Sequence, residues 1–177
     1  LTGSGSSGGL GKVIRAQPLK AYGGILEDSD KLSAWFVCAE LIMRALPDSA
    51  PNLQLFALLE QFAQFLHETT LTASGVKTAL TQFQIKTMAS LGLGIKLPTE
   101  PGTVLFSQDQ GGFVITNATD GLPVSKEVFD SFLQLSKKNF TASLGMPAEQ
   151  SVVIEKLVNR FVSYQLEREI KSQRYMV

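Results

Sequence analysis

Apolar side chains recur at helical spacing in three stretches of the first half of the chain. The Asp28-Ser29-Asp30 sequence can cap a helix that runs from about residue 31 to residue 46. Pro51-Asn52 opens a second helix with a broad apolar stripe. Ser74 can cap a third, from about residue 76 to residue 91. The side chains expected to face the core are Leu32, Trp35, Phe36, Ala39, Leu41, Ile42 and Leu46, then Leu55, Leu58, Leu59, Phe62, Phe65 and Leu66, and then Leu80, Phe83, Ile85 and Met88.

The pattern changes between residues 98 and 124, where proline and glycine are frequent. Two short β-prone segments, 103–107 and 112–116, are joined by a turn that contains Gly111 and Gly112, which predicts a small hairpin. Helical spacing returns afterwards. Two further helices are expected, one from Lys126 to about Leu135 after a Ser125 cap, and a long one roughly from Pro147 to Arg174.

The first residues differ from this helical remainder. Residues 1–9 are rich in glycine and serine and have nothing to bury, so we expect a flexible leader. Residues 12–17 alternate roughly and include β-branched side chains, which predicts a short strand. The sequence therefore predicts a flexible leader with one strand at 1–26. A strand needs partners to pair with, and none is obvious nearby in the sequence. A mostly α domain follows at 27–177 and carries the hairpin as an insert at about 98–124.

The charges of the 177 residues cancel, because sixteen basic and sixteen acidic side chains are present. The chain therefore has no overall field to attract nucleic acid, and any DNA contact must come from local basic clusters. The single cysteine, Cys38, cannot form an internal disulfide, nor can it build a zinc cluster with the single histidine, His67. These features fit a cytoplasmic protein, and no apolar stretch reaches the roughly 18 residues of a membrane span.

No constellation of residues predicts catalysis. His67 lies beside Glu68 near the end of a predicted helix. A general base is one interpretation, and a histidine favoured by the helix dipole is the simpler one. The glycines of residues 8–12 lack the spacing of a phosphate-binding loop. We therefore expect a protein that is not an enzyme and that uses no cofactor and no metal.

Basic side chains gather at the predicted strand and on the predicted last helix. Between Lys156 and Arg174 there are five basic and two acidic side chains, which leaves a local charge of plus three. The residues predicted to contact DNA phosphates are Lys12, Arg15, Lys20, Lys156, Arg160, Arg168, Lys171 and Arg174. The competing interpretation is a solvated helix face with pairs such as Glu167 and Lys171.

Four segments have an order and spacing that point to a family. They are Val13–Tyr22, Leu80–Ile85 running into Leu91–Leu97, Gly111-Gly112-Phe113, and Phe161–Leu166 followed by Ile170–Met176. They resemble, in turn, the last strand of the OB-fold of the bacterial recombination mediator RecO, its helix with a Leu-Gly-Tyr-Gly stop, the Gly-Gly turn of its zinc-binding insert, and its C-terminal helix and tail. The resemblance covers about residues 12–176.

The resemblance implies a non-catalytic mediator that binds single- and double-stranded DNA, anneals complementary strands and helps to load the recombinase RecA onto strands coated with SSB. It implies RecR and the C-terminal tail of SSB as partners. The expected fold is a mostly α helical bundle with a small β-hairpin insert, preceded by a remnant strand of an OB-fold, the barrel that binds strands through basic grooves and stacking aromatics.

Two departures from the family pattern affect these expectations. Many RecO proteins hold the Gly-Gly turn with four cysteines and zinc, but residues 98–118 contain no cysteine, so the hairpin must form without metal. The family also often carries arginines just before the helix phenylalanine, where the acidic SSB tail docks, and this chain has Thr81-Gln82 there. Phe83 and Lys86 are the remaining candidates for partner binding. Lys86 is a poor substitute for an arginine, because a lysine presents a point charge, whereas an arginine can bind a carboxylate through two parallel hydrogen bonds.

Two other classes of function stay open. A helical adaptor without DNA binding would hold a partner peptide in an apolar groove, and the zero net charge favours it. That interpretation would be strengthened if carboxylates paired with Arg160, Arg168 and Lys171 and if these residues lay away from any groove. A hydrolase or metal enzyme would require a deep pocket in which His67 faces a carboxylate.

Overall fold

The computed structural model describes residues 14–15, 17, 20–47, 51–99, 102–115, 121–141, 146–167 and 170–176, with only the backbone of residues 174 and 175. The elements in chain order are α1 (Gly23–Leu26), α2 (Ser29–Ala45), α3 (Leu53–Glu68), α4 (Ala73–Ser90), β1 (Val104–Ser107), β2 (Gly112–Ile115), β3 (Leu122–Pro123), α5 (Lys126–Lys137), α6 (Ala148–Gln165) and the 3₁₀ helix η1 (Lys171–Tyr175). The fold is mostly helical with a small antiparallel sheet, as predicted.

Side chains cap the helices close to where the sequence places them. The Asp28 carboxylate accepts hydrogen bonds from the amides of Asp30 and Lys31 at the start of α2. Asn52 and Ser125 cap α3 and α5 in the same way. The predicted Ser74 cap is wrong, because the hydroxyl of Thr72 accepts from Gly75 N at 3.1 Å and α4 begins at Ala73. Both residue types bind the amide three residues on, so the pattern did not separate them.

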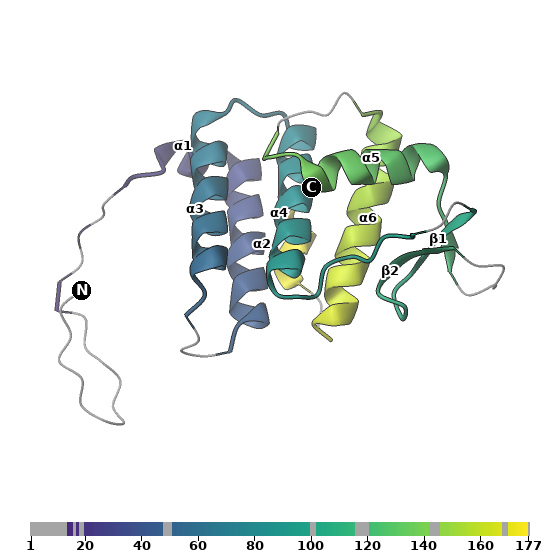
Figure 1. Ribbon diagram of the computed structural model, residues 1–177. Helices are drawn as coiled ribbons and strands as arrows, with labels where there is room; N and C mark the ends of the chain where they lie inside the picture. Colours follow the sequence, from purple (N-terminus) through teal and green to yellow (C-terminus); the bar gives the residue numbers. More distant parts are fainter. Residues whose placement is uncertain are drawn as a thin grey trace.

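Helix α4 is the central helix of the bundle. It packs against α2, α3, α5 and α6, and α5 crosses the other helices near one end (Figure 1). Between Gly75 and Met88 every residue of α4 except Lys77 and Lys86 is buried. The four apolar residues predicted to face inward are therefore buried, but so are Gln82 and Gln84, which the one-sided stripe did not predict.

α4 ends at Ser90, one residue before the predicted end, and a glycine follows closely. Gly92 adopts φ +76°, in the left-handed region that favours glycine. Leu93 N then donates to Met88 O at 2.9 Å, and Gly92 N donates to Ala89 O at 3.0 Å. These two bonds satisfy carbonyls that the helix itself leaves without a partner.

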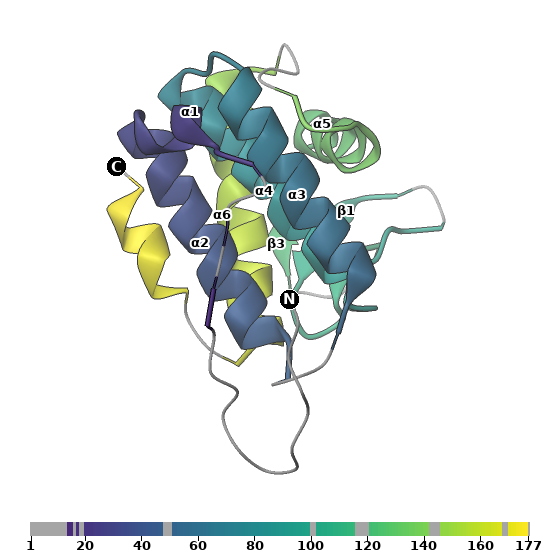
Figure 2. The ribbon, with the colours of Figure 1, turned by 90° about the vertical axis from the view of Figure 1, so that its left-hand side faces the viewer.

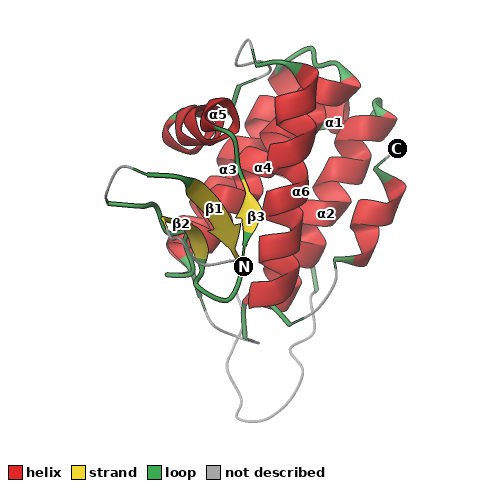
Figure 3. Ribbon diagram, turned by 90° about the vertical axis from the view of Figure 1, so that its right-hand side faces the viewer, coloured by secondary structure: helices red, strands yellow, loops and turns green. Residues whose placement is uncertain are grey.

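The predicted hairpin is confirmed. β1 and β2 pair antiparallel from Val104 opposite Ile115 to Ser107 opposite Gly112. A third strand, β3, pairs with the other edge of β1, and its two residues give too short a pattern to be predicted. The sheet lies beside α6 and next to α5 (Figure 3).

Aromatic packing attaches the hairpin to the helices. The centroid of the Phe113 ring lies 5.1 Å from that of Phe106, 5.1 Å from that of Phe129 and 4.7 Å from that of Phe132. Phe106 in turn meets Phe161 of α6 at 6.2 Å. Buried rings in edge and tilted pairs are a large stabilising contribution. Within the described ranges, no group of His, Cys, Asp and Glu is placed to hold a metal ion.

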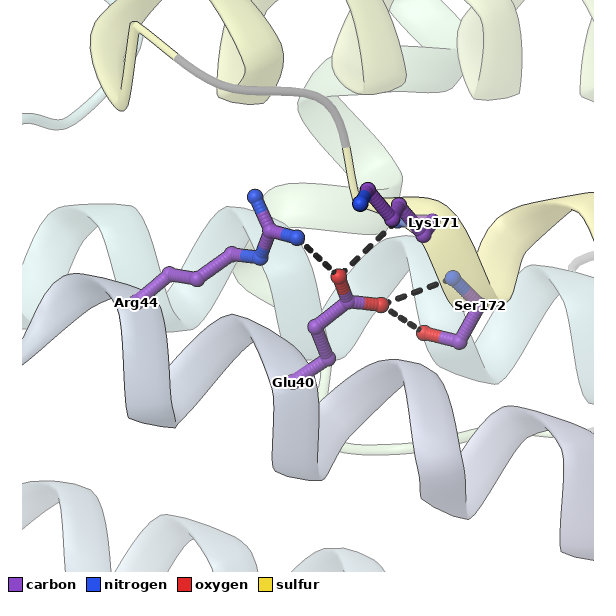
Figure 4. Close-up of polar contacts among 4 residues, drawn as sticks. All are labelled: Glu40, Arg44, Lys171 and Ser172. Carbon is purple, nitrogen blue, oxygen red and sulfur yellow. Dashed lines mark hydrogen bonds and ion pairs between the residues drawn. The ribbon is translucent and has the colours of Figure 1, made fainter.

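The predicted long last helix is wrong beyond Gln165. α6 ends at Gln165, and Glu167 takes a positive φ of 52°. The chain then returns along α2 as a C-terminal strap (residues 170–176) that contains η1 (Figure 2). Ile170 is buried, and the Glu40 carboxylate accepts from the amides of Lys171 and Ser172 at 2.9 and 2.7 Å (Figure 4). This tertiary contact replaces the helical continuation that the local sequence favours.

The predicted strand at 12–17 is not formed where the structure describes it. Ile14, Arg15 and Gln17 belong to no strand, and Ile14 is 91% exposed. Strand pairing needs a neighbouring edge, and the three described strands form one sheet in which Ile14, Arg15 and Gln17 take no part. The other residues of that segment, and the predicted leader at 1–9, lie outside the described residues.

Candidate partner groove and basic residues

An open groove of about 830 Å³ lies between α3, α4 and the C-terminal end of α5. Its lining mixes small apolar and uncharged polar side chains with one charged residue, Lys86. The lining residues are Gln54, Ala57, Leu58, Gln61, Lys86, Ala89, Ser90, Ser136, Asn139 and Phe140. Since no carboxylate is among them, the groove is suited to a partner segment that carries negative charge.

A buried glutamine holds the wall of this groove in place. Gln82 of α4 is fully buried, and its Nε2 donates to Leu135 O at 3.2 Å and to Asn139 O at 3.0 Å. Its Oε1 accepts from Thr141 N at 3.0 Å. One side chain thus satisfies backbone groups at the end of α5 and in the segment after it, where buried polar groups need partners.

Phe140 completes the wall from the same segment. Its ring packs on Phe62 and Phe65 of α3, with centroid distances of 5.1 and 5.9 Å. Because Gln82 fixes the backbone on both sides of Phe140, the polar network and the aromatic contact position each other. The groove is therefore built by three helices and by a segment after α5 whose backbone Gln82 holds in place.

The two predicted partner-binding residues have different environments. Lys86 is half-buried and lines the groove, where its ammonium can meet a carboxylate. Phe83 is fully buried and packs on Phe62 at 4.9 Å between centroids. Its ring belongs to the core in this conformation and presents no surface to a partner.

The predicted DNA-contacting residues do not form one basic face. Lys156 and Arg160 are exposed on α6, and Arg160 lines a small cleft of about 270 Å³ beside the hairpin. Lys171 is exposed on the strap, where the break after α6 removes it from the helix face of Arg160. The single continuous basic helix expected from the sequence is therefore not present.

The N-terminal basic residues lie elsewhere. Lys20 donates to the Gln64 side chain of α3 at 2.8 Å, and its Nζ lies 5.9 Å from the Tyr22 ring centroid. α3 and the hairpin occupy opposite sides of the bundle (Figure 1). Arg15 is exposed. Lys12, Arg168 and the side chain of Arg174 lie outside the described residues.

The contacts of His67 are structural. Its Nδ1 accepts a hydrogen bond from Gly24 N at 3.1 Å, and its ring meets Tyr22 edge-on with centroids 6.0 Å apart. It thereby satisfies an amide at the start of α1. Cys38 is fully buried, and burial raises the pKa of its thiol, so it is suited to packing and not to nucleophilic chemistry.

Most groove residues were not predicted to be functional. Gln54 and Gln61 are seven residues apart and flank Ala57 and Leu58 on one side of α3. A sequence pattern that breaks an exposed face with small residues carries a weak signal of this kind. Ser136 and Asn139 reach the groove only because α5 ends beside α3. The sequence around these two residues contains no pattern that would predict this packing.

Comparison with known proteins gives one finding and two absences. Residues 26–174 match the model of the family described as recombination protein O, C terminal. No curated protein and no solved structure matches the chain. As a separate observation on the described residues, no helix is both long enough and apolar enough to cross a bilayer.

Proposed function

The chain belongs to the family of the recombination protein O C-terminal domain, and from this premise we propose that it works in DNA recombination and repair as a non-catalytic mediator. A mediator of this kind binds DNA and partner proteins, anneals complementary strands and helps to load RecA. It acts through binding energy, without covalent chemistry, and works in the cytoplasm.

The groove between α3, α4 and α5 is the observation that supports this proposal most directly. It is open, it is built by well-packed elements, and its one charged lining residue is Lys86. A short peptide with an acidic end would place its carboxylates near Lys86. Its apolar side chains would lie against Ala57, Leu58 and Phe140, a mode in which an apolar groove gives affinity and a charge gives orientation.

The acidic C-terminal tail of SSB has the required chemistry for this groove. A lysine forms one charge-assisted contact where an arginine would form a bidentate pair. We therefore propose weak, salt-sensitive docking of the tail. RecR is proposed as a second partner, and the groove chemistry alone does not distinguish the surface it would use.

The test is binding of a fluorescein-labelled SSB tail peptide to the whole chain, followed by anisotropy. Lys86→Ala is expected to weaken binding about tenfold, and Lys86→Glu to weaken it further, because a charge-assisted contact is worth roughly 1.5 kcal/mol or more. Lys77→Ala is the matched control, since Lys77 lies on the same helix and is not part of the groove lining.

Equal binding by wild type, Lys86→Glu and Lys77→Ala would exclude the groove as the tail site. Equal melting temperatures for the three proteins would show that the comparison reports on binding and not on folding. RecR and SSB pull-downs with the same variants then distinguish a partner at the groove from one elsewhere.

A helical adaptor without DNA binding is the second candidate function. The zero net charge favours it, and so does the dispersal of the basic residues, with Lys20 beside α3, Arg160 on α6 and Lys171 on the strap. No ion pair is recorded for Arg160 or Lys171 in the described part of the chain, so the pairing that would have strengthened this alternative is not seen there. Tail binding combined with no DNA binding at low salt would favour the adaptor.

A further inference from the structure

The turn between β1 and β2 brings together charged and aromatic groups that are distant in the sequence. Asp109 lies at the tip of this turn, and its carboxylate is near enough to the Tyr164 hydroxyl of α6 to raise the pKa of that phenol. Arg160 lies one helical turn before Tyr164 on the same helix. On the other side, Lys96 is held against the hairpin, because Lys96 N donates to Gly111 O and Lys96 O accepts from Phe113 N, each at 3.0 Å.

Two shallow clefts flank Asp109, and each contains one of these cations. The first, of about 270 Å³, is lined by Arg160 together with Ser107, Gln108 and Asp109. The second, of about 210 Å³, is lined by Lys96 with Asp109 and the glycines at positions 92, 94 and 111. Asp109 belongs to both clefts, so the surface passes from Arg160 across Asp109 to Lys96. Tyr164 lines neither cleft, but it lies on α6 one turn after Arg160 and next to Gln165, which lines the second cleft.

The exposed groups on this surface are those that bind single strands. Arg160 and Lys96 are exposed and carry no recorded ion pair among the described residues, so their charges are available to phosphates. Tyr164 is 47% exposed, and the nearby Asp109 carboxylate raises the pKa of its phenol. An exposed, uncharged ring beside cations is a platform on which an unpaired base can stack.

We propose that Arg160, Tyr164 and Lys96 form a single-stranded DNA track across the hairpin turn, with Asp109 as a negative charge that limits its affinity. Single strands fit better than duplex DNA, because only unpaired bases offer a face to the ring. The inference rests on the DNA binding proposed above and adds the location and type of strand. Two of its residues, Lys96 and Tyr164, are distant in sequence from any basic cluster.

Removing the charge of Asp109 should increase the affinity for DNA, an effect that misfolding of the protein would not produce. Its carboxylate lies in both clefts and repels phosphates that approach Arg160 or Lys96. Asp109→Asn removes this charge and retains a group that can accept from Tyr164. The variant is therefore expected to bind single strands more tightly, whereas a misfolded variant would bind less.

The experiment measures anisotropy of a fluorescein-labelled 20-nucleotide oligo-dT with the whole chain at low salt. Lys96→Ala, Arg160→Ala and Tyr164→Leu are each expected to weaken binding up to about fivefold, and Asp109→Asn to tighten it about two- to fivefold. Lys126→Ala is the control for a lost positive charge, because Lys126 is exposed on α5 and pairs with Asp130. It is expected to bind within about twofold of wild type.

The outcomes separate the track from the general proposal of DNA binding. If the wild type binds and all four variants have the same affinity as the Lys126→Ala control, the track is overturned and DNA binding must use another surface. No binding of wild type at low salt would overturn both. Weaker binding by the three variants and tighter binding by Asp109→Asn, at unchanged melting temperatures, supports the track.

Discussion

At the scale of single residues, the contact between Gly24 and His67 shows how a distant side chain restricts a short element. A Cβ atom at Gly24 would lie 2.7 Å from His67 O and 2.9 Å from its Nδ1. His67 also accepts the amide of Gly24, so the backbone of α1 is held directly against the end of α3. The Gly23-Gly24 pair begins a helix, because this contact supplies a partner that the local sequence lacks.

Gly24→Ala is expected to lower the free energy of unfolding by about 1–3 kcal/mol, since the added methyl group overpacks the contact with His67. Gly23→Ala is the matched control, because the nearest atom to its added Cβ would be Glu27 Oε1 at 3.9 Å. That variant is expected to be neutral, or more stable by up to about 1 kcal/mol through the entropy of the unfolded chain. Urea denaturation measures both, and equal losses for the two variants would contradict the contact.

At the scale of elements, the break after α6 shows a tertiary contact overriding local preference. The residues that follow Gln165 are mostly good helix formers, which is why one long helix was predicted. Glu40 of α2 binds two amides and the hydroxyl at the start of η1, and Arg44 lies beside it (Figure 4). Together with buried Ile170, these bonds stabilise the strap over a continued helix, although Glu167 must adopt a positive φ.

Glu40→Gln is expected to release the strap, because it removes the charge that attracts both amides and Arg44. The open population should rise about tenfold, which corresponds to roughly 1.5 kcal/mol for lost charge-assisted hydrogen bonds. Faster tryptic cleavage after Lys171 and faster exchange of the Lys171 and Ser172 amides would report the opening. Glu60→Gln, at an exposed position of α3, should leave both rates unchanged, and unchanged rates in Glu40→Gln would refute the role of Glu40.

The same contact predicts a dependence on pH. Partial burial opposes ionisation of Glu40, but the hydrogen bonds from Ser172 and Lys171 and the charge of Arg44 outweigh it and lower the pKa of Glu40 to about 2. A free glutamate has a pKa near 4.3, so the stabilisation is complete above about pH 5 and is lost as the pH falls toward 2. Amide exchange in the strap should accelerate over that acid range in wild type, beyond the intrinsic pH dependence, and not in Glu40→Gln.

The hairpin is the second element whose position depends on a tertiary contact. Its aromatic side chains pack on the helices, and no group of metal ligands is present among the described residues. Phe113→Ala is expected to cost about 3–5 kcal/mol of unfolding free energy. Phe56→Ala, at a ring that is 67% exposed on α3, should change it by less than about 0.5 kcal/mol. A chelator should leave the melting temperature unchanged, and a melting temperature that falls with chelator would point to a bound metal.

At the scale of the whole molecule, the balance of charge determines how the protein can approach DNA. Equal numbers of basic and acidic side chains provide no long-range attraction. The predicted basic residues that the structure describes are also dispersed, with Lys20 beside α3, Arg160 on α6 and Lys171 on the strap. Any strand must therefore be bound by a few local contacts.

The dependence of DNA affinity on salt should accordingly be shallow. Each phosphate neutralised on a single strand contributes about −0.7 to the slope of log K against log salt. Two or three contacts predict a slope of about −1.4 to −2.1 in anisotropy titrations at several salt concentrations. A slope steeper than about −4 would require a larger basic surface than the described residues offer.

The sequence by itself determined the helical class, the helix starts at Asp28, Asn52 and Ser125, the end of α4 near residue 91 and the two strands of the hairpin. These features depend on interactions within a few residues, such as a cap with an amide three positions on, or on the period of apolar side chains. The order of the motifs also sufficed to identify the family.

Tertiary structure alone decided where polar and charged groups meet. Gln82 and Gln84 resemble surface residues in the sequence, yet they are buried because four helices surround α4. The strap ends α6 because Glu40, more than 120 positions earlier in the chain, binds its amides. The groove around Lys86 and the surface around Asp109 arise in the same way. The free energy of such contacts depends on which elements pack together, and no local pattern records that.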